Sequence, residues 1–192
     1  MDLGAFMAAE FEAHEKTLSA TRDSVAEPFE RLLGACARSI RGGGKIVFFG
    51  NGGSAADAQH LATELSVRYK RDRAPIAGLA LTTDTSAITA ICNDTDFSDM
   101  FARQIEALCR PPDVAIGIST SGNSVNVNRG LETARKIGAT AAGFSGKTGG
   151  VMKDLADPFI LIPSDDTARI QEMHITIGHM LCGALEIELG LL

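Results

Sequence analysis

The sequence predicts an α/β protein, a three-layer αβα sandwich in which one parallel β-sheet lies between two layers of helices. Two observations lead to this expectation. Segments with helix-like spacing alternate with strands, and such alternation produces right-handed crossovers and a parallel sheet. The strands themselves are short, continuous apolar runs, as expected where both faces of a strand are buried. These five runs lie at 45–49, 77–81, 114–118, 140–144 and 159–162.

Helices are expected before, between and after the strands. The first forty residues carry apolar side chains at helix-like spacing, from Ala8 to Cys36, and Gly42–Gly44 ends this unit. Pro28 suits an early turn of a second helix. Further helices are expected at about 54–69, 85–109, 123–137, 150–156 and 167–189. We expect one domain over 1–192, with 1–43 as a helical extension that packs in an oligomer.

Composition and charge exclude several classes of protein. There is no apolar run of about 18 residues, so no transmembrane helix is expected. The first six residues carry an acid and no basic region, which argues against a secretory signal and for a cytoplasmic protein. The net charge is −6, and the one basic cluster, 68–73, is interpreted as a solvated helix end rather than a nucleic-acid patch. The four cysteines form no CxxC pair and are expected to be reduced, mostly buried thiols.

A glycine-rich loop follows the first strand, at Gly50–Ala56. Its glycines allow the backbone to turn tightly and to approach a ligand, and Ser54 is a good N-cap for a helix whose free N–H groups attract anions. A tight turn without a ligand is the alternative. The loop also fits a loose dinucleotide pattern, but the acidic residue that this pattern requires could only be Asp84, about thirty residues further on rather than about twenty.

A second polar loop follows the third strand, at Ser119–Ser124. Its four hydroxyls stand before a helix, and hydroxyls together with backbone amides can donate several hydrogen bonds to one phosphate. A capping loop needs fewer hydroxyls than this, so the sequence favours a phosphate site.

Two helices carry side chains of metal-ligand type. His60 and Glu64 lie four residues apart on one helix face, as a divalent-metal pair would, although a surface ion pair has the same spacing. The last helix carries Gln171, His174 and His179. Gln171 and His179 are separated by about 12 Å of rise and about 80° of rotation. One metal can therefore use both only if the side chains lean together or if different chains supply them, and His174 is the less suitable ligand.

Several ordered motifs together resemble the bacterial phosphoheptose isomerases of the sugar isomerase (SIS) superfamily. They are GNGGSAADAQH at 50–60 with Glu64, LTTDTS at 81–86, Asn93-Asp94, STSGNS at 119–124, and RIQEMH at 169–174 with His179. The resemblance spans nearly the whole chain, most strongly 45–186. It implies a five-stranded sheet of the SIS, flavodoxin-like type and a homotetramer with sites near subunit boundaries.

The resemblance also implies a reaction and roles for the matching residues. The reaction is the conversion of sedoheptulose 7-phosphate to D-glycero-D-manno-heptose 7-phosphate through an enediol, the first step toward ADP-heptose and the lipopolysaccharide core. Glu64 and His179 would be the acid–base pair, and one zinc ion per subunit would be held by His60, Glu64, Gln171 and His179. The substrate would contact Asn51, Gly52, Gly53, Glu64, Asn93, Asp94, Ser119, Thr120, Ser121, Ser124 and Gln171.

Two alternative functions remain open on the sequence. A relative in the same superfamily binds the bacterial replication initiator and is non-catalytic, but it lacks the carboxylate that matches Glu64 and the histidine that matches His179. A dinucleotide or nucleotide-sugar enzyme would use the glycine loop, but the hydroxyl loop and the position of Asp84 count against it. No nucleic acid and no membrane are expected as partners.

Overall fold

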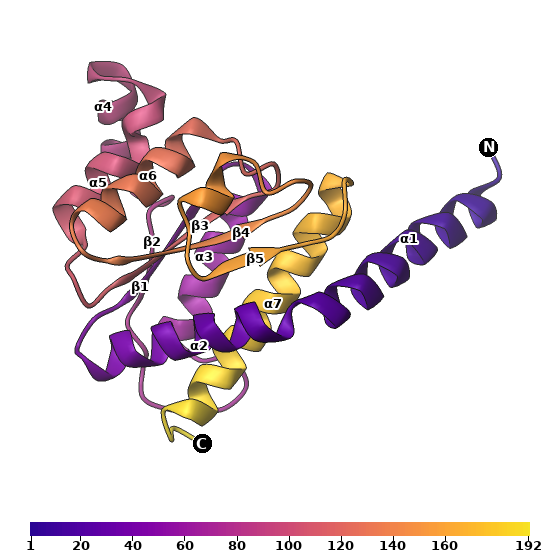
Figure 1. The fold of residues 1–192 in the computed structure, drawn as a ribbon, viewed down its shortest axis with the longest axis horizontal. Coiled ribbons are helices and arrows are strands. Elements are labelled where there is room, and N and C mark those ends of the chain that lie inside the picture. Colours follow the sequence, from indigo (N-terminus) through magenta and orange to yellow (C-terminus); the bar gives the residue numbers. More distant parts are fainter.

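A computed structural model describes all residues from 1 to 192 and contains one five-stranded parallel sheet (Figure 1). The strand order is β2-β1-β3-β4-β5, which is the flavodoxin-like order. Neighbouring strands pair in register from Ile46 opposite Val114 and from Val114 opposite Thr140. The predicted fold class is confirmed, and each predicted strand is present. Their bounds are β1 (Ile46–Gly50), β2 (Gly78–Ala80), β3 (Val114–Ser119), β4 (Thr140–Ser145) and β5 (Phe159–Leu161).

Two hydrophobic cores lie on opposite faces of the sheet, because successive side chains of a strand point to opposite faces. In β1, Phe48 packs into one core and Phe49 into the other, and both are fully buried. The first core is covered by helices α2 (Ala26–Arg41), α3 (Gly53–Ser66) and α7 (Thr167–Glu188). The second core is covered by α5 (Met100–Leu108) and α6 (Val125–Lys136).

The helix expected over 85–109 is divided in the structure, and this part of the prediction is wrong. It consists of α4 (Thr85–Asp94), the 3₁₀ turn η1 (Phe97–Asp99) and α5. Asp96 takes an extended conformation, and its carboxylate accepts a hydrogen bond from the backbone N–H of Ser98. This local bond competes with the helical ladder and breaks it without glycine or proline. Likewise, the helix expected at 150–156 is a 3₁₀ turn, η2 (Val151–Asp154).

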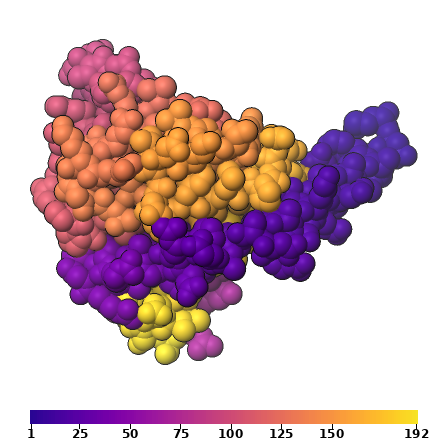
Figure 2. Space-filling view, viewed as in Figure 1, coloured from indigo at the N-terminus to yellow at the C-terminus, as the bar shows by residue number.

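The first helix, α1 (Leu3–Ser24), projects from the body of the molecule (Figures 1 and 2). Its middle is fixed to the start of α7, where Arg169 donates to the carbonyl oxygen of Glu10 and His14 contacts Glu172 at 2.8 Å. Its first half exposes the large apolar side chains of Leu3, Phe6, Met7 and Phe11. α2 behaves differently, since it packs on the sheet within the first core.

No helix has the length and apolarity that a membrane crossing requires. All four cysteines are free thiols, and three of them are buried. The expectation for the basic cluster 68–73 is wrong at one residue. Arg68 is exposed, but the side chain of Arg73 is fully buried against Glu186.

Candidate active site

The two polar loops lie next to each other at the carboxyl edge of the sheet. β1 and β3 are neighbours, and the strand order reverses between them, with β2 on one side and β4 on the other. In open parallel sheets, ligands bind at the carboxyl ends of the strands where the order reverses. The glycine loop follows β1 and the hydroxyl loop follows β3, so both stand at this position.

The glycine loop turns sharply into α3. Gly52 has φ 56° and ψ −121°, a conformation that side chains with a Cβ rarely adopt, and α3 begins at the next residue. The predicted N-cap, Ser54, is wrong: Gly52 holds the cap position, and Ser54 is buried within the first turn. The positive φ at the cap position favours glycine, so no side chain caps the helix and its start presents backbone N–H groups instead.

Asn51 of the glycine loop is held by a residue that sequence reasoning missed. The side-chain amides of Asn51 and Asn126 exchange two hydrogen bonds, each of 2.8 Å. Asn126 is almost fully buried in the first turn of α6, and its Oδ1 also accepts the N–H of Val127. This reciprocal pair joins the loop after β1 to the helix after β3. No short sequence motif indicates it, because the two residues are 75 positions apart.

In the hydroxyl loop, Ser119 is buried and the other three hydroxyl residues are partly exposed. Ser124 precedes α6 but makes no capping hydrogen bond, and its Oγ instead lies 2.9 Å from Oγ of Ser119. Ser121 Oγ accepts the N–H of Asn123, which tightens the turn. Thr120 and Ser121 are half-buried beside them. Together with the start of α6, this loop can bind an anion without a fixed positive charge.

A cavity of about 600 Å³ opens between the two loops. Asn51 and Ser124, two of the predicted substrate contacts, line it together with Val125 and Asn126. The opposite wall is the segment Asp96–Ser98, which the sequence did not indicate. Arg129 of α6 holds this wall through hydrogen bonds to Ser98 and to Asp99, the latter of 2.7 Å. The volume suits a small ligand, because binding pockets usually measure about 300–1,000 Å³.

Asn93 and Asp94 lie outside this cavity in the single chain. They end α4, both are exposed, and Asn93 donates to the carboxylate of Asp94 at 2.8 Å. Their expected contact with substrate therefore stays a prediction.

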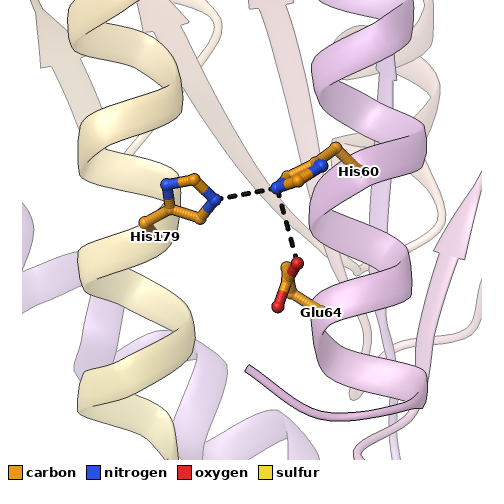
Figure 3. A group of neighbouring side chains, drawn as sticks. All are labelled: His60, Glu64 and His179. Atoms are coloured by element: carbon orange, nitrogen blue, oxygen red, sulfur yellow. Dashed lines mark hydrogen bonds and ion pairs between the residues drawn. The ribbon is translucent and has the colours of Figure 1, made fainter. Parts of the chain in front are cut away.

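Three predicted ligands meet where α3 lies beside α7 (Figure 3). The Nε2 atoms of His60 and His179 are 2.8 Å apart, and Oε1 of Glu64 is 3.4 Å from Nε2 of His60. One ligand atom of each residue lies within 4.8 Å of the others. The group is partly open to solvent, since the side chain of His60 is 48% exposed and that of Glu64 is 19% exposed. These three residues could hold a metal ion.

Gln171 lies elsewhere on the same pair of helices. Its Nε2 would stand 2.5 Å from a Cβ at position 53, so it contacts the start of α3 rather than its middle. His60 follows Gly53 by seven residues, a rise of about 10 Å along the helix. α7 runs parallel to α3, as the contacts Gln171–Gly53 and His179–His60 indicate. The fourth predicted ligand therefore stands beside the glycine loop in this chain.

The environment changes the acid–base properties of three groups near α3 and α7. Partial burial, together with the neighbouring His60, holds the pKa of His179 below its usual range, which favours the neutral imidazole. Burial raises the pKa of Asp57, one turn before His60, to about 6, and its Oδ2 has no hydrogen-bond partner. Burial lowers the pKa of His174 to about 4, and its Nε2 lies 3.1 Å from the carbonyl oxygen of Ser145, away from the three-residue group.

Comparison with known proteins identifies the family. A model of the SIS domain matches residues 11–146. A phosphoheptose isomerase of Paramagnetospirillum magneticum is 57% identical over 186 residues, which cover 97% of this chain and 97% of that protein. The chain belongs to the phosphoheptose isomerase family of SIS-domain proteins. The resemblance predicted from the sequence motifs is thereby confirmed.

Solved structures of phosphoheptose isomerases agree with this assignment. GmhA from Neisseria gonorrhoeae is 37% identical to this chain and superposes with a TM-score of 0.90. The match covers 96% of this chain and 99% of the GmhA chain. The phosphoheptose isomerase from Francisella tularensis is 30% identical, covers 97% of this chain with 100% of its own, and gives a TM-score of 0.93. Membership of this isomerase family disfavours the alternative of a non-catalytic regulatory protein.

Proposed function

We propose that this chain is an aldose–ketose isomerase that converts sedoheptulose 7-phosphate to D-glycero-D-manno-heptose 7-phosphate through an enediol. One observation carries the proposal: in a member of this family, a carboxylate and two imidazoles from α3 and α7 lie within 4.8 Å of one another, and α3 is the helix that follows the glycine loop. The substrate carries its phosphate on C7 and reacts at C1 and C2, so its phosphate site and its acid–base groups must be separated. The rise of about 10 Å from Gly53 to His60 along α3 places the acid–base groups away from the carboxyl edge of the sheet, where the hydroxyl loop lies.

The phosphate is assigned to the hydroxyl loop, and the sugar to the residues around it. Ser119, Thr120, Ser121 and Ser124 offer hydroxyls beside the start of α6, which supports this assignment. The remaining proposed substrate contacts are Asn51, Gly52, Gly53, Glu64, Asn93, Asp94 and Gln171.

The residues on α3 and α7 fit one zinc ion per subunit. Ligands of a tetrahedral zinc ion are about 3.3 Å from one another, and the separations of 2.8 and 3.4 Å among His60, His179 and Glu64 are close to this value. Two imidazoles and a carboxylate are also the ligand types that catalytic zinc sites use. Gln171 is the proposed fourth ligand, reached by a change of its rotamer or supplied by another copy. When bound, zinc supplies a Lewis acid that polarises the substrate carbonyl.

Glu64 and His179 are the proposed acid–base pair. Isomerisation moves a proton between C1 and C2 and a second proton between the oxygens on these carbons. We assign the carbon proton to the Glu64 carboxylate and the oxygen proton to His179. A His179 imidazole with a lowered pKa is neutral near pH 7 and is therefore able to accept a proton.

We further infer that residues 1–192 form a single domain and that the protein assembles as a cytoplasmic homotetramer. Its proposed reaction would be the first step of the route to ADP-heptose and the lipopolysaccharide core. The projecting half of α1, with its exposed apolar side chains, supports association with other copies. Four free thiols are typical of a reducing compartment.

The test is a turnover assay with purified, zinc-loaded protein. Sedoheptulose 7-phosphate is added, and the anomeric proton of the aldose product is followed by NMR. We expect product to form, and thorough chelation of zinc to stop its formation. No product from folded, zinc-loaded protein would contradict the proposal, and turnover that survives chelation would remove zinc from it.

A further inference from the structure

A buried ion pair lies at the far end of α3, about one turn beyond Glu64. Nε of Arg73 is 2.9 Å from Oε1 of Glu186, and the two side chains are 0% and 1% exposed. A buried ion pair is weak evidence for stability, because the cost of removing both charges from water offsets much of their attraction. The hydrogen bonds of the pair indicate a different role.

Arg73 ends α3 by binding its free carbonyl groups. Nη2 donates to the carbonyl oxygen of Glu64 at 2.7 Å, and Nη1 donates to that of Leu65 at 2.7 Å. The last carbonyl groups of a helix lack partners within the helix, and a cation that binds them fixes the final turn. The backbone that carries the Glu64 side chain is thus held by a buried guanidinium.

Glu186, on α7, connects Arg73 to the backbone of Tyr69. The same Oε1 that binds Arg73 also accepts the backbone N–H of Tyr69 at 3.2 Å. The ring of Tyr69 stacks on the imidazole of His179, with 5.4 Å between centroids and 21° between planes. A Cβ at Gly183 would stand 3.1 Å from Cε1 of Tyr69, so the absence of a side chain there lets the ring lie against α7.

We propose that Tyr69 is a positioning residue for the acid–base pair, held in place by Arg73 and Glu186. This inference rests on the proposed function, because it takes Glu64 and His179 as the reacting groups. One buried pair fixes the backbone of Glu64 and, through Tyr69, one face of the His179 ring. The ring of Tyr69 blocks rotation of the imidazole away from His60. Acid–base groups and metal ligands require such support, since departures of about 10–20° from the productive orientation reduce activity.

The test compares two substitutions at Tyr69, which is half-buried and packs against the edge of the first core, and the unfolding temperature of each variant is measured beside wild type. Tyr69→Phe keeps the stacked ring, and Tyr69→Leu removes it. For Tyr69→Leu we expect kcat to fall by roughly 10–100-fold and zinc affinity to weaken by roughly 10-fold, as for other residues that orient metal ligands. KM should stay within about twofold of the wild-type value, because Tyr69 is not one of the proposed substrate contacts. Tyr69→Phe should match wild type in kcat, KM and zinc affinity.

Zinc affinity, measured by competition with a chelator, is a readout that does not depend on turnover. If wild-type protein has no isomerase activity, the proposed function fails, and the zinc affinities of the two variants still test the positioning. Equal kcat and zinc affinity in Tyr69→Leu and wild type would overturn the inference. So would an effect on KM alone, or a loss in Tyr69→Phe as large as that in Tyr69→Leu.

Discussion

The Nε2 atoms of His60 and His179 lie 2.8 Å apart, although 119 positions separate the two residues in the sequence. The contact exists because α3 and α7 run side by side in the same direction on one face of the sheet. At this distance the N–H of one imidazole donates a hydrogen bond to the other, or both nitrogen lone pairs face a shared cation.

The shared cation leads to a prediction about zinc content. His60→Asn should weaken zinc binding by about 100-fold or more, because loss of a direct ligand costs at least as much as loss of a residue that orients one. The measurement is the zinc content per chain after dialysis. His14→Asn is the matched control, since His14 lies on α1 and pairs with Glu172 outside the group. Equal zinc content in His60→Asn and in the control would exclude His60 as a ligand.

The hydroxyl loop gives a prediction about the phosphate. Ser124→Ala should lower kcat/KM for sedoheptulose 7-phosphate by roughly 10–100-fold, because a hydrogen bond to a charged group contributes about 1.5–3 kcal/mol. Sedoheptulose without phosphate serves as the comparison substrate, and its slow turnover should be unchanged by the substitution. An equal loss on both substrates would show that Ser124 acts on something other than the phosphate.

The hydrogen-bonded side chains of Asn51 and Asn126 predict that the two residues affect KM through each other. Asn126→Ala should raise KM by roughly 10-fold, since it releases Asn51, a proposed substrate contact, from two hydrogen bonds worth about 1 kcal/mol each. Residues that act through one another are not additive. The double variant Asn51→Ala with Asn126→Ala should therefore have the same KM as Asn51→Ala alone. Additive effects in kinetic assays of the three variants would mean that Asn126 acts independently.

The buried histidine gives a prediction about pH and stability. The pKa of His174 is about 4 in the folded chain, against about 6.5 in an unfolded one. Between these values only the unfolded state binds the proton, so stability falls as the pH falls from about 6.5 toward 4, by up to about 1.4 kcal/mol per pH unit.

Denaturant unfolding of wild type and His174→Gln at pH 7, 6 and 5 measures this contribution. The wild-type free energy of unfolding should fall more steeply with decreasing pH than that of the variant. Asp57, whose raised pKa has the opposite effect, is present in both proteins and cancels in the difference. Identical pH dependence would mean that His174 is protonated equally in both states.

The sheet could be predicted from sequence because its central strands, such as β1 and β3, are buried on both faces. Because these strands have no exposed face, runs such as 45–49 and 114–118 are mostly apolar. The loops that follow them are rich in glycine and polar residues, so the strand ends are easily recognised. The break in the helix expected over 85–109 could not be predicted. A single side chain, that of Asp96, interrupts the helix by a local hydrogen bond. Many aspartates lie within helices, so the residue type alone does not indicate a break.

The loops of the candidate site could be predicted from the sequence, whereas the contacts that support them could not. Glycine and hydroxyl clusters and the His60–Glu64 spacing are local patterns, whereas Asn126, Arg73 and Glu186 act through partners far along the chain. The burial of Arg73 could not be predicted from the sequence. This residue lies in a cluster of charged residues that is typical of a solvated helix end, and only the packing of α7 against the end of α3 buries it.

The most direct test of the account is the rate of Glu64→Gln in the NMR turnover assay, beside wild type. Glutamine keeps the size of the side chain and an oxygen that can face a metal, but it is not basic. Zinc content and the unfolding temperature are measured on the same samples, so that loss of metal or of folding is recognised. We predict product from wild type and a loss of roughly 100-fold or more in the folded, zinc-loaded variant. A near-normal rate in that variant would contradict the assignment of Glu64 as the base.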